Sequence, residues 1–271
     1  MKKITIMTPC YNEEGNIEDL YLRVKEVFNQ LPNYEYEHLF IDNASQDKTV
    51  DELKKIAQKD PGVKVIVNAR NFGPVRSGYY GILQCYGDAV IPIVADLQDP
   101  PELILEFVKK WEEGYKVVKA FKTPMKEGSF FYFARQIFYY LMDNLSDIKI
   151  TRNFTGFGLY DQKVINVLRE INDPYPYFRG LIEELGFESF SFEYQQQRRK
   201  RGISSYNFYR YYSEAMLGIT SHSQVPLRLA TMLGFALSLL SLLVALGYLI
   251  AKLLFWDYFP LGTVPIMVGL F

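Results

Sequence analysis

Apolar residues in the first 120 positions follow two different periods. Short apolar runs have the length and character of buried strands at residues 4–8, 38–41, 63–67, 89–94 and 117–121. Between these runs, apolar side chains recur at helical spacing over residues 17–31, 50–57, 74–86 and 102–113. Regular alternation of strands and helices predicts an α/β domain with a parallel-rich sheet and helices on both faces.

A much longer apolar stretch lies near the end of the chain. Residues 229–251 contain no charged side chain and are bracketed by Arg228 and Lys252. A helix of this length reaches about 35 Å, which is enough to cross a bilayer. An aromatic cluster at residues 255–259 suits a membrane interface. The next uncharged run, residues 261–271, is too short to span, so we expect the chain to stop inside a second spanning helix.

These patterns divide the chain into three parts. We expect an α/β domain over residues 1–204, a juxtamembrane amphipathic region over 205–226 and a transmembrane region over 227–271. Aromatic and basic side chains crowd residues 206–212, as at a headgroup-level surface, whereas the aromatic stretch at residues 130–140 is expected to be mainly core. Basic residues precede the first span (Arg198, Arg199, Lys200, Arg201, Arg210 and Arg228). The positive-inside tendency therefore places the α/β domain in the cytoplasm.

Composition excludes several classes of protein. Lys and Arg number 30 and Asp and Glu 31, so the chain lacks the basic excess of a general nucleic-acid binder. The two cysteines, Cys10 and Cys85, lie in apolar runs and imply neither a disulfide framework nor a cysteine-based zinc site. His38 and His222 are too far apart in sequence to indicate a histidine cluster. A reducing, cytoplasm-facing compartment fits these counts best.

A polar motif follows the first predicted strand, at the end where α/β sheets bind ligands. Residues 9–14 read PCYNEE. Tyr11 can stack on a base, and Glu13 can accept hydrogen bonds from a ribose or a base. The same residues also fit a helix N-terminus that is capped by Asn12 and favoured by the helix dipole.

Similar polar motifs follow the second and third strands. Residues 42–47 read DNASQD, in which Asp42 is placed to hydrogen-bond a nucleotide. The alternative is an Asx-type turn in which Ser45 or Asp47 caps the next helix, and we favour the cap for Asp47. Residues 68–73 read NARNFG. Arg70 in this motif would either face phosphate or form a surface ion pair.

The most informative motif follows the fourth strand, where residues 96–102 read DLQDPPE. Mg²⁺ and Mn²⁺ prefer oxygen ligands and usually bind through one or two carboxylates plus substrate phosphates. A cation held by Asp96 would be placed to neutralise a diphosphate leaving group. The alternative is a strand-to-helix turn with Asp99 as the N-cap and Pro100 at the first helical position.

In this order, the motifs resemble those of the membrane-bound polyprenyl-phosphate glycosyltransferases of glycosyltransferase family two, which include the dolichol-phosphate-mannose-synthase-like and bactoprenol-glucosyltransferase-like enzymes. The resemblance runs from residue 4 to about residue 235 and includes residues 199–206, RKRGISSY, which are similar to a loop that closes over substrate phosphates. It implies a GT-A fold with a parallel-rich mixed sheet, followed by C-terminal transmembrane helices. It also implies inverting transfer of a sugar from a UDP-sugar or GDP-mannose to a polyprenyl phosphate at the cytoplasmic face of the cell membrane.

The resemblance further implies a set of site residues. The nucleotide would be bound by Pro9, Tyr11, Glu13, Asp42 and Arg70. The metal, Mg²⁺ or Mn²⁺, would be held by Asp96 and Gln98. Phosphate and acceptor groups would be bound by Arg135, Arg199 and Ser205, with Asp96 and Arg199 as the catalytic residues. Members of the family also form homo-oligomers, so a homo-oligomer is compatible with the resemblance.

Two positions depart from the family pattern. Many members carry an acid two positions before Asp96, where this chain has Val94. Members also often carry an acid at the position that falls on Gly156, so the usual candidate for a catalytic base is missing. A hydroxyl acceptor benefits from a base, whereas a phosphate with a second pKa of about 6 is already mostly dianionic at neutral pH. The substitution therefore favours a phosphate acceptor, although Asp161 could replace the base or simply cap the following helix.

Two other functions remain open. The same fold could pass the sugar to a hydroxyl of a glycan or of a lipid-linked saccharide. Val94 and Gly156 also motivate a catalytically inactive membrane scaffold that binds a nucleotide sugar. Chain polymerisation is disfavoured, because residues 195–199 read QQQRR and lack the Trp of the Gln-x-x-Arg-Trp block of processive synthases.

Overall fold

The computed structural model describes residues 1–123, 154–197, 208–223 and 225–255 of the 271-residue chain. The chain divides into two compact units, Met1–His222 and Ser223–Phe271. The first unit is an α/β domain, and the second contains one long helix, α9 (Val225–Leu254). Residues 130–140, for which we expected a mainly core role, lie outside the described residues.

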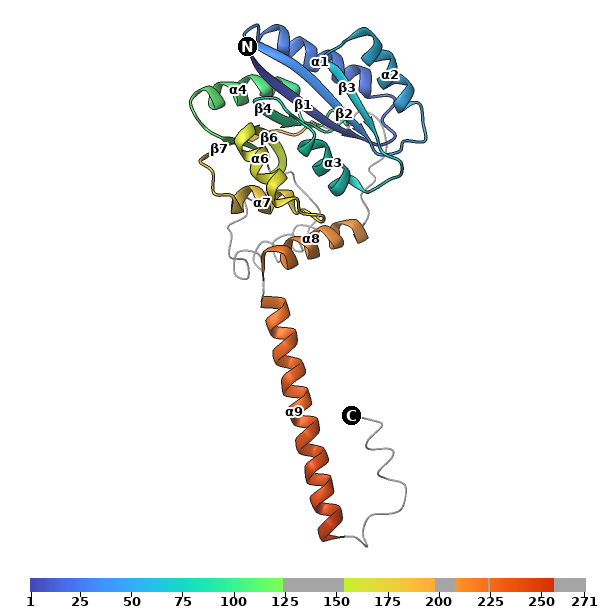
Figure 1. Ribbon diagram of the computed structural model, residues 1–271, viewed down its shortest axis with the longest axis vertical. Coiled ribbons are helices and arrows are strands. Elements are labelled where there is room, and N and C mark those ends of the chain that lie inside the picture. The colour runs from blue at the N-terminus through green and yellow to red at the C-terminus, as the bar shows by residue number, and fades with distance from the viewer. Residues whose placement is uncertain (124–153, 198–207, 224, 256–271) are drawn as a thin grey trace. The chain divides into compact units, whose positions relative to one another are not determined.

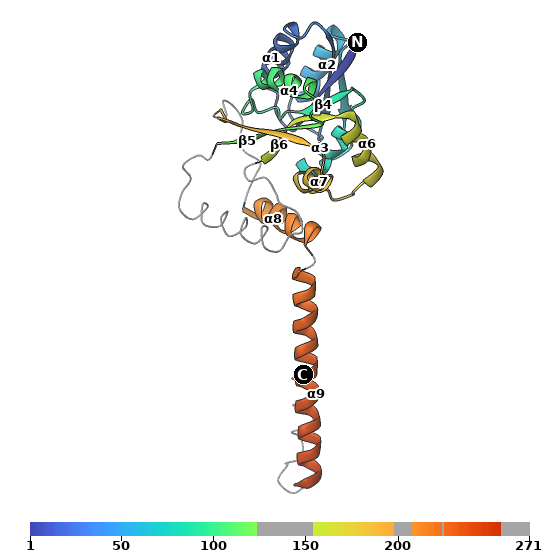
Figure 2. The ribbon, with the colours of Figure 1, turned by 90° about the vertical axis from the view of Figure 1, so that its left-hand side faces the viewer.

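A seven-stranded sheet forms the centre of the first unit (Figures 1 and 2). Its strands are β1 (Lys2–Cys10), β2 (Tyr34–Asp42), β3 (Val63–Val67), β4 (Ala89–Pro92), β5 (Val117–Lys122), β6 (Phe154–Asp161) and β7 (Ser189–Tyr194). They lie in the order β3-β2-β1-β4-β6-β5-β7. Only β6 runs against its neighbours among these strands; β1 to β4 pair in parallel, as do β5 and β7. The predicted parallel-rich mixed sheet is confirmed.

Helices cover both faces of this sheet, which explains why the strands of β1 and β2 are apolar on both sides. One face packs against α1 (Ile17–Asn29), α2 (Thr49–Lys59) and α4 (Ile104–Glu112). The other face packs against α3 (Pro74–Leu83), α6 (Gln162–Ile171) and α7 (Phe178–Glu184), as Figure 1 shows. A short 3₁₀ helix, η1 (Pro101–Leu103), precedes α4, and α8 (Phe208–His222) ends the first unit.

The elements predicted for the first 120 residues are all present, with boundaries that differ by a few residues. The third strand has the predicted bounds, while β4 ends at Pro92 and α3 at Leu83, before the predicted ends at 94 and 86. The helix predicted over residues 102–113 divides into η1 and α4. The sequence pattern did not predict β6, β7 or α7.

The strand β6 lies unusually close to β5. Gly158 pairs with Lys119, and a Cβ atom on Gly158 would lie 2.2 Å from the carbonyl oxygen of Val118. No side chain fits at that distance, so glycine is required here by the close approach of the two backbones.

The second unit agrees with the hydropathy pattern. Within α9, the stretch Leu227–Leu254 is long and apolar enough to cross a membrane, and it contains the predicted span, residues 229–251. The part of the chain in which we expected a second span, residues 261–271, lies outside the described residues.

The contact at Gly158 gives a test of the sheet packing. We expect Gly158→Ala to lower the free energy of unfolding by about 1–3 kcal/mol, because the new methyl group would force β5 and β6 apart. The measurement is denaturant unfolding of the detergent-solubilised protein. Gly78→Ala is the matched control, since nothing lies within 4 Å of a Cβ atom there and Ala favours the helix α3. Equal stability of the two variants would contradict the close approach.

Candidate active site

The loops that follow β1, β2, β3 and β4 emerge at one edge of the sheet. In the parallel register, Cys10 lies beside Asp42, and Asp42 lies beside Val67, so three strands end at the same level. The chain after β4 leaves at this edge too, because the N–H of Ile93 donates to the carbonyl of Met7 at 2.9 Å. The structure therefore brings together the loops that carry the predicted residues Pro9, Tyr11, Glu13, Asp42, Arg70, Asp96 and Gln98.

Asp42 is fully buried at the end of β2 and organises the loop that follows. Its carboxylate accepts the backbone N–H of Ser45 at 2.9 Å and also the hydroxyl of Ser45. The Cys10 thiol lies 4.0 Å from the same carboxylate, and burial, followed by the charge of Asp42, raises the pKa of this thiol well above its usual value. Asp42 thus forms an Asx-type turn, which was the alternative interpretation of this motif.

The β1 and β2 loops are joined by Asn12. Its backbone N–H donates to Ser45 Oγ at 2.9 Å, and its Oδ1 accepts the N–H of Gln46 at 2.8 Å. Asn12 (φ 55°) and Ala44 (φ 62°) both adopt the left-handed backbone conformation, which costs energy for a residue with a side chain. The predicted helix cap at Asn12 is wrong, because α1 begins only at Ile17, after Asn16. The side chain of Asn12 is instead used to bridge two loops.

Two acidic residues, Glu13 and Asp47, make further hydrogen bonds in the loops after β1 and β2. The carboxylate of Glu13 accepts the amide of Asn16 at 2.6 Å, and its backbone N–H donates to the hydroxyl of Thr49 at 2.9 Å. Asp47 accepts the backbone N–H of Thr49, the first residue of α2, at 3.0 Å. The predicted capping role of Asp47 is confirmed in this sense, although Lys48 is the residue directly before the helix.

Three asparagines connect the β2 loop to the β3 loop, and the sequence interpretation missed them. Asn43 Nδ2 donates to Asn71 Oδ1 at 3.0 Å, and Asn43 Oδ1 accepts from Asn68 Nδ2 at 3.2 Å and from the N–H of Phe72 at 2.9 Å. We call Asn43, Asn68 and Asn71 the asparagine network. The available signal was the position of Asn43 and Asn68 directly after the ends of two parallel strands.

Arg70 is exposed on the β3 loop. Its guanidinium lies 4.1 Å from the centre of the Phe72 ring, which is a cation–π contact. In the described part of the chain it forms no ion pair, so the surface ion pair that we considered for it is not found there. Its Nη1 also donates to the carbonyl of Asn71 at 3.4 Å.

The Asp96 loop (residues 93–100) carries side-chain oxygen atoms that could ligate a cation. Asp96 Oδ1 accepts the N–H of Gln98 at 3.1 Å, and Gln98 Nε2 donates to the carbonyl of Gln197 at 3.3 Å. The bond to Gln197 uses the nitrogen of the Gln98 amide, so its oxygen is the atom left to ligate a cation. Among the described residues, no three His, Cys, Asp or Glu side chains gather to form a metal site. One carboxylate and one amide oxygen fit Mg²⁺ or Mn²⁺ only if substrate phosphates and water complete the coordination.

Asp99 has a role that the sequence did not predict. Its carboxylate is 4% exposed and accepts the hydroxyl of Tyr194, at the end of β7. Burial raises the pKa of Asp99, and the nearby charge of Lys122 and the bond from Tyr194 oppose this only in part. The predicted N-cap at Asp99 with Pro100 at the first helical position is wrong, because helical structure begins at Pro101. The carboxylate of Asp99, which a cap would need, is instead bonded to the hydroxyl of Tyr194, 95 residues away in sequence.

Position 156, where many family members carry an acid, has a backbone conformation that favours glycine. Gly156 is buried with φ +94°, and a Cβ atom there would lie 3.2 Å from the ring of Phe178. Asp161 does not replace the acid, because it pairs with Ala89, the first residue of β4, whereas Asp96 follows the end of that strand. Asp161 lies at the opposite edge of the sheet and caps α6 by accepting the N–H of Lys163 at 3.0 Å.

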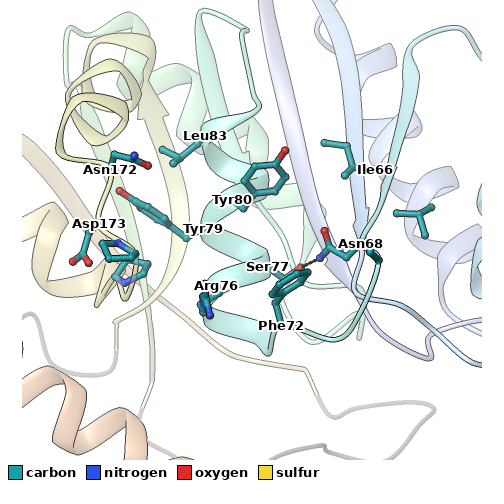
Figure 3. A pocket seen from close by; sticks show the side chains of 14 residues that line it. Ile66, Asn68, Phe72, Arg76, Ser77, Tyr79, Tyr80, Leu83, Asn172 and Asp173 are labelled. Carbon is teal, nitrogen blue, oxygen red and sulfur yellow. Dashed lines mark hydrogen bonds between the residues drawn. The ribbon is translucent and has the colours of Figure 1, made fainter.

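A cavity of about 420 Å³ lies beside this edge, between β3, α3 and residues 172–176 (Figure 3). Its lining includes Asn68, Phe72 and Arg76, and Asn68 donates to Ser77 Oγ at 2.9 Å across its wall. None of the residues predicted to bind the nucleotide or the metal lines it. The predicted residues Arg135, Arg199 and Ser205 lie outside the described residues.

The fold and the edge site define an α/β protein with a GT-A-like fold. Among solved structures, the chain is similar to mannosyltransferase PcManGT from Pyrobaculum calidifontis, with a TM-score of 0.53 and 15% identity over 79% of this chain and 60% of that one. It is similar with the same TM-score to mannosyl-3-phosphoglycerate synthase from Rubrobacter xylanophilus, with 16% identity over 85% of this chain and 75% of that one. These likenesses concern the fold.

Sequence comparisons identify the family. Residues 5–169 match the model of glycosyl transferase family 2. The chain is 38% identical to the uncharacterized glycosyltransferase YkcC of Bacillus subtilis, over 86% of this chain and 72% of that protein. It is 33% identical to the bactoprenol glucosyl transferase of Shigella phage SfV, over 93% of this chain and 82% of that protein. The chain belongs to glycosyl transferase family 2.

The surroundings of Asp161 predict how its loss would act. Burial raises the pKa of this carboxyl, but bonds from Trp111 Nε1, the Lys163 N–H and Lys116 outweigh burial, and the net pKa is lowered. The carboxylate therefore stabilises the fold above the ordinary pKa of Asp, about 3.9, and this contribution is lost as pH falls through the folded-state pKa.

We expect Asp161→Asn to lower the free energy of unfolding by about 1–3 kcal/mol at pH 7. The difference from wild type should shrink as the pH of the denaturation series is lowered below about 4. Asp51→Asn, at an exposed position on α2, is the control and should change little. A variant with unchanged stability and abolished glycosyl transfer would instead make Asp161 the catalytic base.

Proposed function

We propose that this protein transfers a sugar from a nucleoside diphosphate sugar to a polyprenyl phosphate at the cytoplasmic face of the cell membrane, with inversion at the anomeric carbon. One observation carries the proposal. The Asp96 loop and the loops of β1, β2 and β3 meet at one edge of the sheet, in a chain 33% identical to a bactoprenol glucosyl transferase over 93% of its length.

The loops after β1, β2 and β3 would bind the nucleotide. Tyr11 is half-buried and offers a ring for a base, next to Pro9 and to Glu13. Asp42 has its carboxylate bonded to Ser45, so we assign it to holding the loop that faces the nucleotide. The mannosyltransferase PcManGT is described in complex with GDP-Man and Mn²⁺, which supports a nucleotide sugar and a divalent cation here as well.

Asp96 and the amide oxygen of Gln98 would hold Mg²⁺ or Mn²⁺. A bound cation would supply positive charge that offsets the charge developing on the nucleoside diphosphate leaving group. Val94 is 45% exposed, in place of a second carboxylate two residues before Asp96. With one carboxylate only, this chain would depend on the diphosphate itself to hold the cation tightly.

A phosphate acceptor fits what positions 156 and 161 provide. Gly156 brings no carboxylate, and Asp161 lies at the opposite edge of the sheet. A phosphate monoester is mostly dianionic at neutral pH and needs positioning and charge compensation rather than proton removal. Lys122 adds a positive charge at the end of β5, and we expect Arg135, Arg199 and Ser205 to bind the phosphate groups. Arg matches phosphate oxygens with two parallel bonds.

The membrane would bring the lipid to the enzyme. The stretch Leu227–Leu254 has the length and composition of a membrane-spanning helix. We propose that residues 205–226, which include α8, lie along the membrane surface between the catalytic domain and this span. The basic residues before the span favour a cytoplasmic catalytic domain.

The central test is a transfer assay with the full chain in detergent or in vesicles. We expect wild type, with undecaprenyl phosphate and Mg²⁺ or Mn²⁺, to form an acid-labile lipid product from one donor of a panel that includes UDP-glucose and GDP-mannose. Asp96→Ala should reduce the rate at least about 100-fold, because the leaving group loses its counter-charge. Asp51→Ala, an exposed acid on α2, is the control and should keep the rate.

Other outcomes of this assay point elsewhere. Absence of transfer from every donor, or equal rates for wild type and Asp96→Ala, would contradict the proposal. A product that is an extended glycan would favour a hydroxyl acceptor. Metal-assisted nucleotide binding without turnover on any acceptor would favour a non-catalytic scaffold.

Val94 allows a second test. We expect Val94→Asp to raise the affinity for Mn²⁺ in the presence of UDP or GDP about tenfold, because a second carboxylate joins Asp96. The measurement is a Mn²⁺ titration followed by electron paramagnetic resonance. Val94→Asn has the same shape without the charge and should not produce this gain. Equal affinities of the Asp and Asn variants would show that position 94 does not face the cation.

A further inference from the structure

The Asp96 loop is attached to a distant strand. It follows β4, yet its contacts reach β7, which is separated from β4 by β6 and β5 in the sheet. The carbonyl of Gln98 accepts the N–H of Gln197 at 3.0 Å, and the side chain of Gln98 donates back to the carbonyl of Gln197 at 3.3 Å. The hydroxyl of Tyr194 donates to Asp99. We call these three bonds the β7 clasp.

The residues held by the β7 clasp flank a strained position in the Asp96 loop. Leu97 has φ +59° and is 2% exposed, so a buried residue with a large side chain is held in the left-handed conformation. Such a conformation costs about 1–3 kcal/mol and persists only where surrounding contacts fix it. Leu97 stands between Asp96 and Gln98, the two residues that offer oxygen ligands. The conformation of Leu97 therefore sets how these two side chains are placed relative to each other.

Tyr194 is itself firmly anchored. Its ring lies 5.6 Å from that of Phe157, and its carbonyl accepts both the N–H of Thr123 at 3.0 Å and the hydroxyl of Thr123 at 3.1 Å. Only 6% of the residue is exposed. A rigid donor of this kind fixes the buried carboxylate of Asp99, which has lost its hydration.

We propose that Tyr194 is a positioning residue for cation and donor binding, which acts by fixing Asp99 and thereby the strained turn that presents Asp96 and Gln98. This proposal rests on the function proposed above and identifies a part of the site outside the family motifs.

The test compares the full-length protein in detergent with Tyr194→Phe, which removes the hydroxyl and keeps the ring. Affinity for UDP and GDP is measured by calorimetry with and without Mn²⁺, and Mn²⁺ affinity is measured by electron paramagnetic resonance. We expect the Mn²⁺-dependent affinity to fall about tenfold, because release of Asp99 would loosen the turn that presents the two proposed ligands, and loss of such outer contacts typically weakens metal binding by this amount or more. Affinity without metal should change less than about twofold, and raising the Mn²⁺ concentration should restore the affinity with metal.

Tyr21→Phe is the matched control. Tyr21 also donates its hydroxyl to a carboxylate, that of Asp60 at 2.8 Å, but this pair lies before β3, at the amino end of that strand. We expect Tyr21→Phe to lower stability without changing the Mn²⁺ dependence. Gln197→Pro, which removes the N–H donated to Gln98, is a second variant for the case that Tyr194→Phe does not fold, and it should act in the same direction as Tyr194→Phe.

The outcomes separate the two proposals. If wild type binds UDP or GDP with Mn²⁺ and Tyr194→Phe matches wild type or behaves like Tyr21→Phe, the positioning role of Tyr194 is refuted while the proposed function stands. If wild type shows no Mn²⁺-dependent binding of either nucleotide, both proposals fail. Selective loss of the Mn²⁺ dependence in Tyr194→Phe, with rescue by added Mn²⁺, supports the positioning role.

Discussion

Parallel pairing of β1 with both β2 and β4 is the constraint on which the site depends. It sets Cys10 beside Asp42 and carries the chain after β4 to the same edge, so loops about 90 residues apart in sequence meet. The register is fixed by burial, since Ile4 and Ile6 pack on one face of the sheet and Met7 on the other. A shift of the register by one residue would move every side chain of β1 to the other face of the sheet. The buried Thr5 and Thr8 would then lose their present neighbours. The edge site is thus a consequence of core packing.

Among the described strands, β6 alone runs against its neighbours, and this decides which of its residues reach that edge. Because β6 runs against β4, its first residues lie at the carboxyl edge and its last residue, Asp161, lies at the other. The position that could have carried a base is Gly156, whose backbone conformation and contact with Phe178 exclude a side chain without strain. Neither Gly156 nor Asp161 therefore places a carboxylate at this edge, which is the observation behind the phosphate acceptor proposed above.

Local pattern predicted most of the fold and part of the site, and long-range contacts account for the rest. The first five strands follow from apolar runs. The strand β6 was missed because it contains glycines, and Gly158 is required by the close approach of the β5 backbone, which no local pattern shows. The caps expected at Asn12 and Asp99 are wrong for one reason. Each side chain has the right chemistry for a cap but is bonded to a residue far away in sequence, Gln46 and Tyr194 respectively. The motif around Asp96 was recognisable, but the asparagine network depends on pairings that no local pattern contains.

Backbone strain marks the same edge independently of any motif. The described residues include four non-glycine residues with positive φ, and three of them, Asn12, Ala44 and Leu97, lie in the loops after β1, β2 and β4. Glycine would remove the cost at each position, but it would also remove the Asn12 amide that bonds Gln46 and the Leu97 side chain buried in the core. At Asn12 and Leu97 the strain is therefore the consequence of using side chains that the loops need. Loops fixed in this way present their polar groups in a set arrangement before any ligand arrives, which is the condition for electrostatic stabilisation of a leaving group without reorganisation.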